Sequence, residues 1–430
     1  MLVDMSEKTW GEIKDPVHGY VYISEVEKEI IDTYPMQRLR RIRQLAGSEY
    51  VYPGANHTRF EHSIGVLYLT KVLLQNPHLS QVISGDEAKE VRLAALLHDV
   101  GHGPFSHVYE HLLEKFLSKT HEDLTRWVIT KSELGDKLRS LGFNPDKIAR
   151  LAVGVLHEKG KAFLDQVIRS AVDVDKLDFI VRDTYHTGAE YGFVDVYRLL
   201  RTLDILEDNL ALDVGALSAF ESFILARVES FKSIYFHRTS RAVQIMLAYA
   251  MERAKDELGL LDFEDPERYL AKDDYTTWSM LKESEGAAET IRRLENRDLL
   301  KCVYERTFQV KDEFISSLFG KEEFRRNVEE EIANEAKVDS SYVIVDVPNV
   351  PSVPYRHSIL LEPMEVPVFK RTKNGEKVPL DLNRISGIFS ALKGFVNILR
   401  IYTEDRYRSQ VREAAKKILG DTPFSARISF

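Results

Sequence analysis

Histidine and aspartate side chains, which bind metals and transfer protons, are concentrated in one short stretch of the sequence. Residues 96–107, LLHDVGHGPFSH, contain three histidines and one aspartate. A single histidine has an ordinary explanation, because part-buried imidazoles often satisfy polar groups or cap helices. The clustering indicates a shared site instead, since eight of the thirteen histidines lie between residues 57 and 121: His57, His62, His78, His98, His102, His107, His111 and His121.

His98 and Asp99 are the first candidates for metal ligands. They follow VRLAALL, an apolar segment typical of a buried helix. A buried carboxylate needs a partner or a cation, because an unpaired one is costly. A neutral imidazole nitrogen beside a carboxylate oxygen suits Mn, Fe, Co, Ni, Zn or Mg. Gly101 and Gly103 end the helix and let the backbone approach a ligand closely.

Two other segments offer further polar groups. HTRFEHSIGVLYL (57–69) carries Arg59 and His62, whose spacing of three residues places them on one face of a helix. VDVDKLDFIVRD (172–183) sets four aspartates among apolar residues. Either at least one of them faces an interior site, or they pair with the basic residues of the same helix. The residues concerned are Asp173, Asp175, Asp178, Asp183, Lys176 and Arg182.

The elements that must position these residues are mainly helical. Helical periodicity predicts helices over 168–186, 196–206 and 220–258. Strands are predicted at YVYIS (20–24) and, after residue 340, at SYVIVDVP, HSILLEP and VPVFKR, followed by a helix over 385–402. The expected fold is mainly α: a helical body over 1–335 with its core at about 50–190, and a smaller α+β region over 336–430.

Composition limits the possible functions. The formal charge of −9 disfavours a general nucleic-acid binder, although a local basic pocket for a small polyanion is compatible with it. The only cysteine, Cys302, cannot form an internal disulfide, which favours the reducing cytoplasm. The sequence contains no apolar run of about 18 residues, so no membrane span is expected.

The order His62, His98-Asp99, Asp175 resembles the H…HD…D signature of HD-domain metal-dependent phosphohydrolases. Longer strings resemble the dNTP triphosphohydrolase branch of that family. They cover much of residues 14–190: KDPVHGYV (14–21), IIDTYPMQRLRRIRQL (30–45), PGANHTRFEHSIGV (53–66), LLHDVGHGPFSH (96–107) and VDVDKLDFIVRD (172–183). The resemblance implies a helical HD core.

The resemblance also implies a reaction. His62, His98, Asp99 and Asp175 would hold one divalent metal, which acts as a Lewis acid on a phosphoryl group and activates water. In the triphosphohydrolases the bond between the sugar oxygen and the α-phosphorus breaks, and a nucleoside and tripolyphosphate are released. Arg59, His102 and Lys176 match phosphate contacts. The matched catalytic positions are His107, His121, Glu122 and Asp183.

Further matches concern the sugar. Gln44 matches a contact to the 3′-hydroxyl, and Leu45 would crowd a 2′-hydroxyl, although Leu45 is equally explained as a core leucine. Tyr235, His237 and Arg241 are expected near the sugar or base. Where relatives can carry a tyrosine, this chain has Phe179, which removes one possible hydroxyl contact to phosphate.

The resemblance also extends to regulation. Asp32, Gln37 and Arg40 match a regulatory nucleotide site between subunits, which implies a homo-oligomer. The alternative is a solvated helix face, as arginine-rich runs usually are. For function, two alternatives stay open: a phosphatase or pyrophosphohydrolase acting on other nucleotides or alarmones, and a nucleotide-binding regulatory protein without catalysis.

Overall fold

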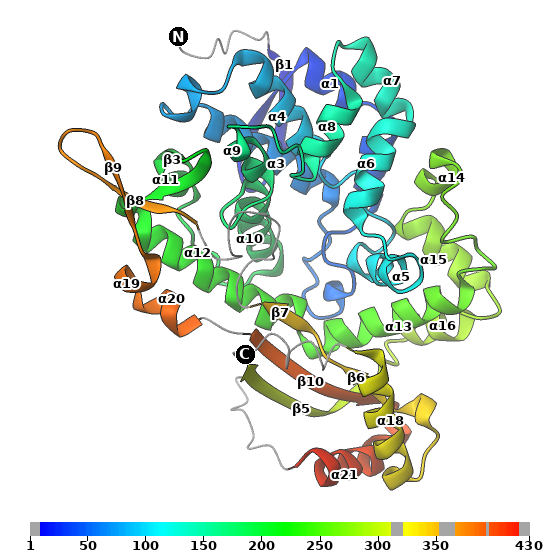
Figure 1. Cartoon of the computed structure of the whole chain (residues 1–430). Helices are drawn as coiled ribbons and strands as arrows, with labels where there is room; N and C mark the ends of the chain where they lie inside the picture. Colours follow the sequence, from blue (N-terminus) through cyan, green and yellow to red (C-terminus); the bar gives the residue numbers. More distant parts are fainter. Residues whose placement is uncertain (1–8, 311–320, 352–365, 393–394, 421–430) are drawn as a thin grey trace.

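The computed structural model describes residues 9–310, 321–351, 366–392 and 395–420 (Figure 1). Most of these residues lie in helices, which confirms the predicted mainly α fold. One large apolar core runs through the helical body, and a smaller core lies against the C-terminal sheet. No helix within the described ranges is long and apolar enough to cross a bilayer.

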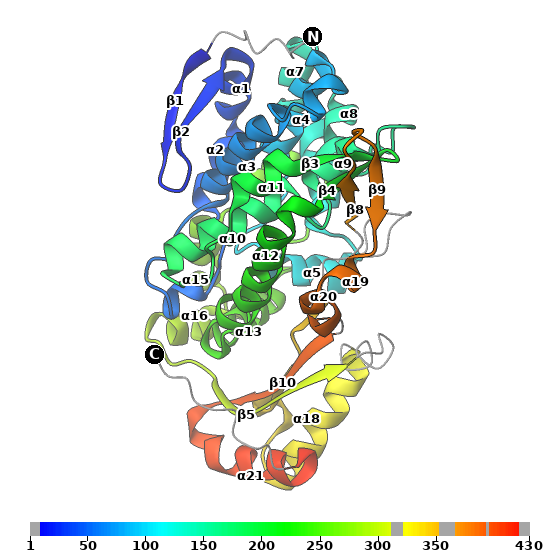
Figure 2. The same ribbon diagram turned by 90° about the vertical axis from the view of Figure 1, so that its left-hand side faces the viewer.

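The chain begins with an antiparallel hairpin of β1 (Thr9–Asp15) and β2 (Gly19–Ser24), so the strand predicted at 20–24 is confirmed. Figure 2 shows the hairpin along one side of the helical body. A capping box starts α1 (Glu25–Ile31): Ser24 Oγ accepts the Glu27 N–H, and the Glu27 carboxylate accepts the Ser24 N–H. Helix α2 (Tyr34–Arg38) and the 3-10 helix η1 (Leu39–Arg41) follow.

Three helices form the centre of the helical body. Helix α3 (Arg59–Leu74) packs against both α4 (Gly85–Leu97) and α10 (Val174–Thr187). Its apolar residues surround the helix, as is typical of a buried helix. Since α4 ends at His98, the packing brings the three segments with candidate ligands together. The loop 98–106 then leads into α5 (His107–Leu117) and α6 (His121–Lys131).

The remaining elements of the body surround this centre. The 3-10 helices are η2 (Ser48–Tyr50), η3 (Leu79–Gln81) and η4 (Val214–Ala216). The α-helices are α7 (Glu133–Ser140), α8 (Pro145–Ala152), α9 (Ala162–Ile168), α11 (Val196–Thr202), α14 (Pro266–Leu270), α15 (Asp274–Glu283) and α16 (Ala288–Glu295). A mixed sheet has the order β3 (Leu203–Leu206), β4 (Asn209–Asp213), β8 (Val368–Arg371), β9 (Lys377–Leu380).

The long helix predicted over 220–258 is interrupted. Helix α12 (Leu217–Ser230) runs into a π-helical turn, η5 (Phe231–Tyr235), and His237 then caps the start of α13 (Arg238–Ala254). The Phe236 N–H donates to the Phe231 carbonyl at 2.8 Å, the spacing of a π-turn. No glycine or proline marks this break, so the apolar pattern could not reveal it.

Two other predicted helices are too long. The segment 168–186 contains the end of α9, a turn, and α10 from residue 174, because Asp173 caps α10 with its side chain. The segment 196–206 contains α11 only to Thr202, after which β3 pairs with β4. In both cases apolar residues continue past the helix, so hydrophobic periodicity does not show its end.

The C-terminal sheet is antiparallel and lies at one end of the helical body (Figures 1 and 2). Its central strand, β10 (Phe395–Thr403), pairs with β5 (Lys301–Val310), β6 (Ile344–Asp346) and β7 (Asn349–Pro351). Helices α18 (Glu322–Ala336) and α21 (Arg408–Leu419) pack on it, with the 3-10 helices η6 (Ser340–Tyr342) and η7 (Asp405–Tyr407) nearby. This core takes residues from both sides of the predicted division at 335/336.

The helix predicted over 385–402 is wrong in its second half. Only α19 (Leu382–Ile385) and α20 (Gly387–Leu392) are helical, and residues 395–402 belong to β10. Residues 398–402 of β10 are all buried, so no alternation distinguishes them from a buried helix. The predicted strands at SYVIVDVP and VPVFKR correspond to β6 and β8, whereas HSILLEP (357–363) lies outside the described residues.

Candidate metal centre and substrate site

The four expected metal ligands come together from helices α3 and α10 and from the turn that follows α4. His62 Nε2 lies 3.2 Å from His98 Nε2, 3.0 Å from Asp175 Oδ1 and 3.8 Å from Asp99 Oδ2. His98 Nε2 lies 3.4 Å from Asp99 Oδ1 and 3.7 Å from Asp175 Oδ1. Donor atoms so close together, two nitrogens and two carboxylate oxygens, match the ligand spheres of divalent first-row metals.

Hydrogen bonds orient both imidazoles toward the centre. His62 Nδ1 lies 2.8 Å from Asp178 Oδ2, and His98 Nδ1 lies 2.8 Å from the Ala95 carbonyl oxygen. A carbonyl oxygen only accepts, so His98 Nδ1 carries the proton and Nε2 is left for a metal. The same assignment for His62 makes Asp178 a carboxylate partner of a metal-binding histidine. The residues present therefore fit a metal.

Electrostatics supports the same conclusion. Burial alone would lower the pKa of His62, but Asp175, Asp178 and Asp99 raise it to about 10. These carboxylates thus favour positive charge at this position, and a bound metal would replace the imidazole proton. Burial would raise the pKa of Asp99, yet the positive charge of Arg59 and the neighbouring His98 and His102 hold it well below its usual range. The pKa of Asp175 is likewise lowered. The carboxylates thus stay ionised and attract a cation.

A charged network supports His62 from behind. Asp178 also accepts from His18 Nε2 at 2.6 Å and from Arg182 Nε at 2.8 Å, and Arg182 Nη1 donates to Asp15 at 2.8 Å. Asp15 accepts the backbone N–H of His18 as well, at 2.7 Å. The network gives a structural role to Asp15 and His18 of the KDPVHG string and to Arg182, since all three belong to the network around Asp178. Sequence reasoning missed Asp15 and His18 as supports, because nothing local links β1 to α10.

The aspartates of 172–183 include residues that face the site and a residue that pairs with a basic neighbour on the same helix, the two alternatives expected from the sequence. Asp175 and Asp178 face the site, whereas Asp173 caps α10 and pairs with Lys176 Nζ at 2.5 Å. Lys176, an expected phosphate contact, is therefore already bound to a carboxylate. Asp183 is fully buried; its Oδ1 lies 2.7 Å from His57 Nε2, and its Oδ2 accepts the Tyr235 hydroxyl.

Basic groups line the side of Asp99. Arg59 Nη1 donates to Asp99 Oδ2 at 2.5 Å and Arg59 Nε to Ser106 Oγ at 2.7 Å, while His102 Nε2 lies 3.3 Å from Asp99 Oδ1. Among the described residues, buried Arg59 Nη2 and His102 Nδ1 have no hydrogen-bond partner. Buried polar atoms without partners are rare and require an explanation. An anion bound beside the metal would provide one.

Glu110 joins the two other histidines. Its Oε1 lies 2.5 Å from His121 Nδ1 and its Oε2 lies 2.9 Å from His107 Nδ1. The His121 ring stacks on His102 at 4.0 Å. Burial opposes charge on His121, but Glu110 raises the pKa of this imidazole. Asp99, His102 and His121 also place one donor atom each within 4.8 Å of one another.

Glu122 takes no part in these hydrogen bonds. Glu122 pairs with Arg169 at 2.9 Å. The carboxylate beside His121 therefore comes from Glu110, not from its sequence neighbour Glu122. Glu110 and His107 are three residues apart on one helix face, a spacing that could have indicated the pair.

The residues expected at the sugar end lie around a small apolar cluster. Leu45, Ala55 and Ile234 form it, with Tyr235 packed against them, so Leu45 has the burial of a core leucine. The Gln44 Oε1 atom is buried without a partner in the described part of the chain. Phe179 contacts the Tyr235 ring edge to face at 6.3 Å.

Two other expected substrate contacts are engaged in structural interactions. His237 Nδ1 accepts the Thr239 N–H at 3.2 Å as the cap of α13. Arg241 forms a two-pronged ion pair with Asp346 of β6, at 2.7 and 3.2 Å. Arg241 therefore joins the helical body to the C-terminal sheet in this structure.

The three residues of the expected regulatory site are neighbours near the protein surface. Gln37 Nε2 donates to the Ile31 carbonyl at 2.8 Å, and Arg40 Nε donates to Gln37 Oε1 at 2.9 Å. Asp32 pairs with Lys28 at 3.0 Å, and the Arg40 guanidinium lies 3.6 Å from the centre of the Phe60 ring. A regulatory site between subunits stays a prediction for these residues.

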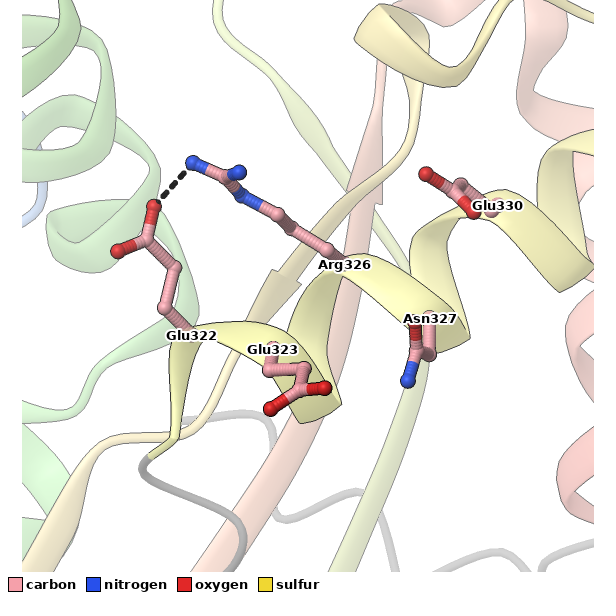
Figure 3. Close-up of a pocket in the computed structure, with 5 residues that line it drawn as sticks. All are labelled: Glu322, Glu323, Arg326, Asn327 and Glu330. Carbon is pink, nitrogen blue, oxygen red and sulfur yellow. Dashed lines mark hydrogen bonds and ion pairs between the residues drawn. The ribbon is translucent and has the colours of Figure 1, made fainter.

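A hollow of about 280 Å³ lies elsewhere, along the exposed side of α18 (Figure 3). Arg326 pairs there with Glu322 at 2.5 Å, and Glu323, Asn327 and Glu330 complete the lining. None of these five residues belongs to the metal cluster. The hollow is an open, mostly acidic helix surface and offers no group for phosphate chemistry beyond the paired arginine.

Family models match two regions of the chain, the HD domain over residues 59–181 and the HD associated region over residues 194–422. The protein belongs to the HD-domain phosphohydrolase family, whose members bind divalent metals. Its relatives include the uncharacterized protein YwfO of Bacillus subtilis, 31% identical over 412 residues and 89% of each chain.

Other relatives carry a named activity or a solved structure. The human protein named deoxynucleoside triphosphate triphosphohydrolase SAMHD1 is 30% identical over 360 residues, which cover 71% of this chain and 56% of that protein. A crystal structure of a hypothetical protein from Aquifex aeolicus matches with a TM-score of 0.76 at 28% identity, over 94% of this chain and 99% of that one.

Proposed function

We propose that the protein hydrolyses deoxynucleoside triphosphates to a deoxynucleoside and tripolyphosphate. The observation that carries this proposal is the unsatisfied buried donor Arg59 Nη2, on a residue that pairs with Asp99 in the proposed metal centre. Such donors suit phosphate oxygens next to a metal. The similarity to proteins named as deoxynucleoside triphosphate triphosphohydrolases selects this substrate class.

His62, His98, Asp99 and Asp175 would hold one divalent metal, which supplies Lewis acidity and an activated water when bound. Arg59 then donates to phosphate oxygens and neutralises charge. Burial and the charge of Arg59 hold the pKa of His102 well below its usual range, so His102 would contact the phosphates as a neutral ring. His107, held through Nδ1 by Glu110, has Nε2 left to exchange a proton with the leaving sugar oxygen. His121 shares the same carboxylate, and its raised pKa favours a cationic ring near the phosphates.

The sugar end of the proposed site is the cluster around Leu45. Buried Gln44 Oε1 would accept from the 3′-hydroxyl, and Leu45 would crowd a 2′-hydroxyl. Asp183 lies beside this cluster through its hydrogen bond with Tyr235. The proposal also includes a cytoplasmic setting, a homo-oligomer, and regulation by a nucleotide at Asp32, Gln37 and Arg40.

The test is incubation with a panel of dNTPs and NTPs in Mn²⁺ or Mg²⁺, with nucleosides, nucleotides and phosphate chains separated by ion exchange. The proposal expects deoxynucleoside and tripolyphosphate in equal amounts. Release of orthophosphate or pyrophosphate would instead identify a phosphatase or pyrophosphohydrolase, and no turnover would favour a binding protein.

Variants connect this activity to the proposed centre. His98→Ala and Asp99→Ala should each lower kcat by at least about 1,000-fold, because each removes a metal ligand. His78→Ala is the matched control, since this half-exposed histidine lies outside the cluster. Full activity in both ligand variants would place the chemistry elsewhere.

A further inference from the structure

One buried carboxylate from the HD associated region holds two segments that border the metal centre. Asp274 is the first residue of α15 and is 5% exposed. Its Oδ1 accepts the Phe105 N–H at 2.7 Å, and its Oδ2 accepts the Arg43 N–H at 3.0 Å. Each carboxylate oxygen thus fixes a different backbone segment.

The backbone that Asp274 holds is strained. Phe105 and Ser106 have φ values of 59° and 54°, and Ser106 has ψ of −114°. L-residues rarely adopt such conformations, which persist only where surrounding contacts determine them. Strained backbone of this kind is concentrated at functional sites. Asp274 supplies one of these contacts at Phe105.

The strained turn leads directly to the groups of the site. Ser106 Oγ accepts from Arg59 Nε and donates to the Arg43 carbonyl, both at 2.7 Å. Arg59 in turn binds Asp99. His107, the first residue of α5, follows Ser106. A shift of the turn would therefore move both Arg59 and His107.

Neighbouring residues hold the same loop independently. The Tyr269 hydroxyl donates to the Gly101 carbonyl at 2.8 Å. Arg38 Nη1 donates to the His102 carbonyl at 2.7 Å, and Arg38 Nε donates to the Lys272 carbonyl at 2.9 Å. Residues 269–274 thus contact the loop directly at two points and through Arg38 at a third.

The carboxylate is retained there at a cost. Burial raises the pKa of Asp274 to about 6, although the two N–H donors and the charges of Arg43 and Arg38 lower it. A residue selected for packing alone would not need this charge, and perturbed carboxyl groups are concentrated at functional sites.

We propose that Asp274 is a positioning residue for the loop 98–106: by fixing Phe105 and Arg43 it sets Ser106, and through Ser106 the placement of Arg59 and His107. This inference rests on the proposed function for its kinetic consequence. It assigns to the HD associated region a direct part in the geometry of the HD domain.

Asp274→Asn tests the inference, because an asparagine side chain has a single acceptor oxygen. Only one of the two N–H groups, that of Phe105 or that of Arg43, would keep its acceptor. We expect kcat to fall about 10- to 100-fold, as small misplacements of catalytic groups do. KM should change less, and Mn²⁺ affinity should stay at the wild-type value. In hydrogen-exchange mass spectrometry, peptides covering 103–107 should exchange at least about tenfold faster.

Asp273→Asn is the matched control. Asp273 is an equally buried neighbour that caps α15 and pairs with Arg41, and asparagine also caps helices. This variant should keep wild-type kcat and exchange. Ser106→Ala is a second probe: it removes the link to Arg59 while Asp274 stays, so kcat should fall without faster exchange at Phe105.

Wild-type kcat and wild-type exchange at 103–107 in Asp274→Asn would overturn the inference. Loss of Mn²⁺ binding would also overturn it, since Asp274 would then support the whole core. If the wild-type protein hydrolyses no dNTP, the proposed function fails. Hydrogen exchange at residues 103–107 then tests the positioning role by itself. Faster exchange in Asp274→Asn would support that role, and unchanged exchange would overturn it.

Discussion

Residues 59–181 carry all four expected metal ligands, whereas residues 194–422 carry side chains that hold the site from outside. In the first region the Nε2 atoms of His62 and His98 lie 3.0 to 3.8 Å from carboxylate oxygens of Asp99 and Asp175. In the second, Tyr235 binds Asp183 and Asp274 binds the loop before His107. The comparison indicates that the proposed ligands come from the first region and that side chains of the second region hold residues next to them. Substitutions in the two regions should therefore affect different measurements.

The largest effect outside the ligands is expected for Asp178→Asn in the first region. It leaves Arg182 buried with only Asp15 and weakens the support of His62. We expect the free energy of unfolding to fall by about 3 to 5 kcal/mol and Mn²⁺ affinity, measured by calorimetry, to fall about 10- to 100-fold.

Asp173→Asn is the control on the same helix, because Asp173 caps α10 and bonds to Ser170 and Lys176 rather than to His62. It should leave Mn²⁺ affinity unchanged. Wild-type affinity in Asp178→Asn would show that the network behind His62 has no role in metal binding.

The next effect concerns the second region and pH. Asp274 has a pKa raised from 3.8 to about 6, so its contribution to stability is present below pH 3.8 and is lost as pH rises through about 6. The loss amounts to at most about 3 kcal/mol. Urea unfolding should therefore show the wild type losing stability relative to Asp274→Asn between pH 4 and pH 7, and a pH-independent difference would contradict this.

Glu110→Gln separates positioning of the histidines from metal binding. Glutamine keeps the size but removes the charge that orients His107 and His121. We expect kcat to fall about 10- to 100-fold with unchanged Mn²⁺ affinity, whereas Glu122→Gln, whose partner is Arg169, should retain most of kcat. An equal loss of kcat in Glu110→Gln and Glu122→Gln would contradict the special role of Glu110 in orienting the two histidines.

The smallest effect is expected for Arg241→Gln at the boundary with the C-terminal sheet. Because Asp346 already occupies the guanidinium, KM for a dNTP should rise less than about threefold. A rise of about tenfold or more would instead support the substrate contact expected from the sequence.

The sequence predicted that His62, His98, Asp99 and Asp175 come together, because the chemistry of those residues is unusual at their positions; their role as metal ligands stays a prediction. An aspartate after VRLAALL and a histidine on a buried helix need a shared explanation, and the resemblance supplied the order. It did not predict their supports. Asp15, His18 and Asp274 are ordinary polar residues in sequence, and only the packing of β1 and α15 against the core gives them partners.

The fold shows the same contrast. Helices with clear caps, such as α3 after Thr58, agree with the pattern of apolar residues. The break at η5 was missed because no glycine or proline marks it, and the strand β10 was missed because its buried residues 398–402 do not alternate with exposed ones. Their conformations depend on partners far away in sequence, β5 in the case of β10.

Metal content is the most direct test of the central claim, that His62, His98, Asp99 and Asp175 hold one divalent ion. The protein would be loaded with Mn²⁺, freed of unbound metal by gel filtration, and analysed by plasma mass spectrometry beside Asp99→Ala and His78→Ala. We predict about one Mn²⁺ per chain in the wild type and in His78→Ala, and less than about a tenth of that in Asp99→Ala. Equal metal in all three proteins would contradict the account.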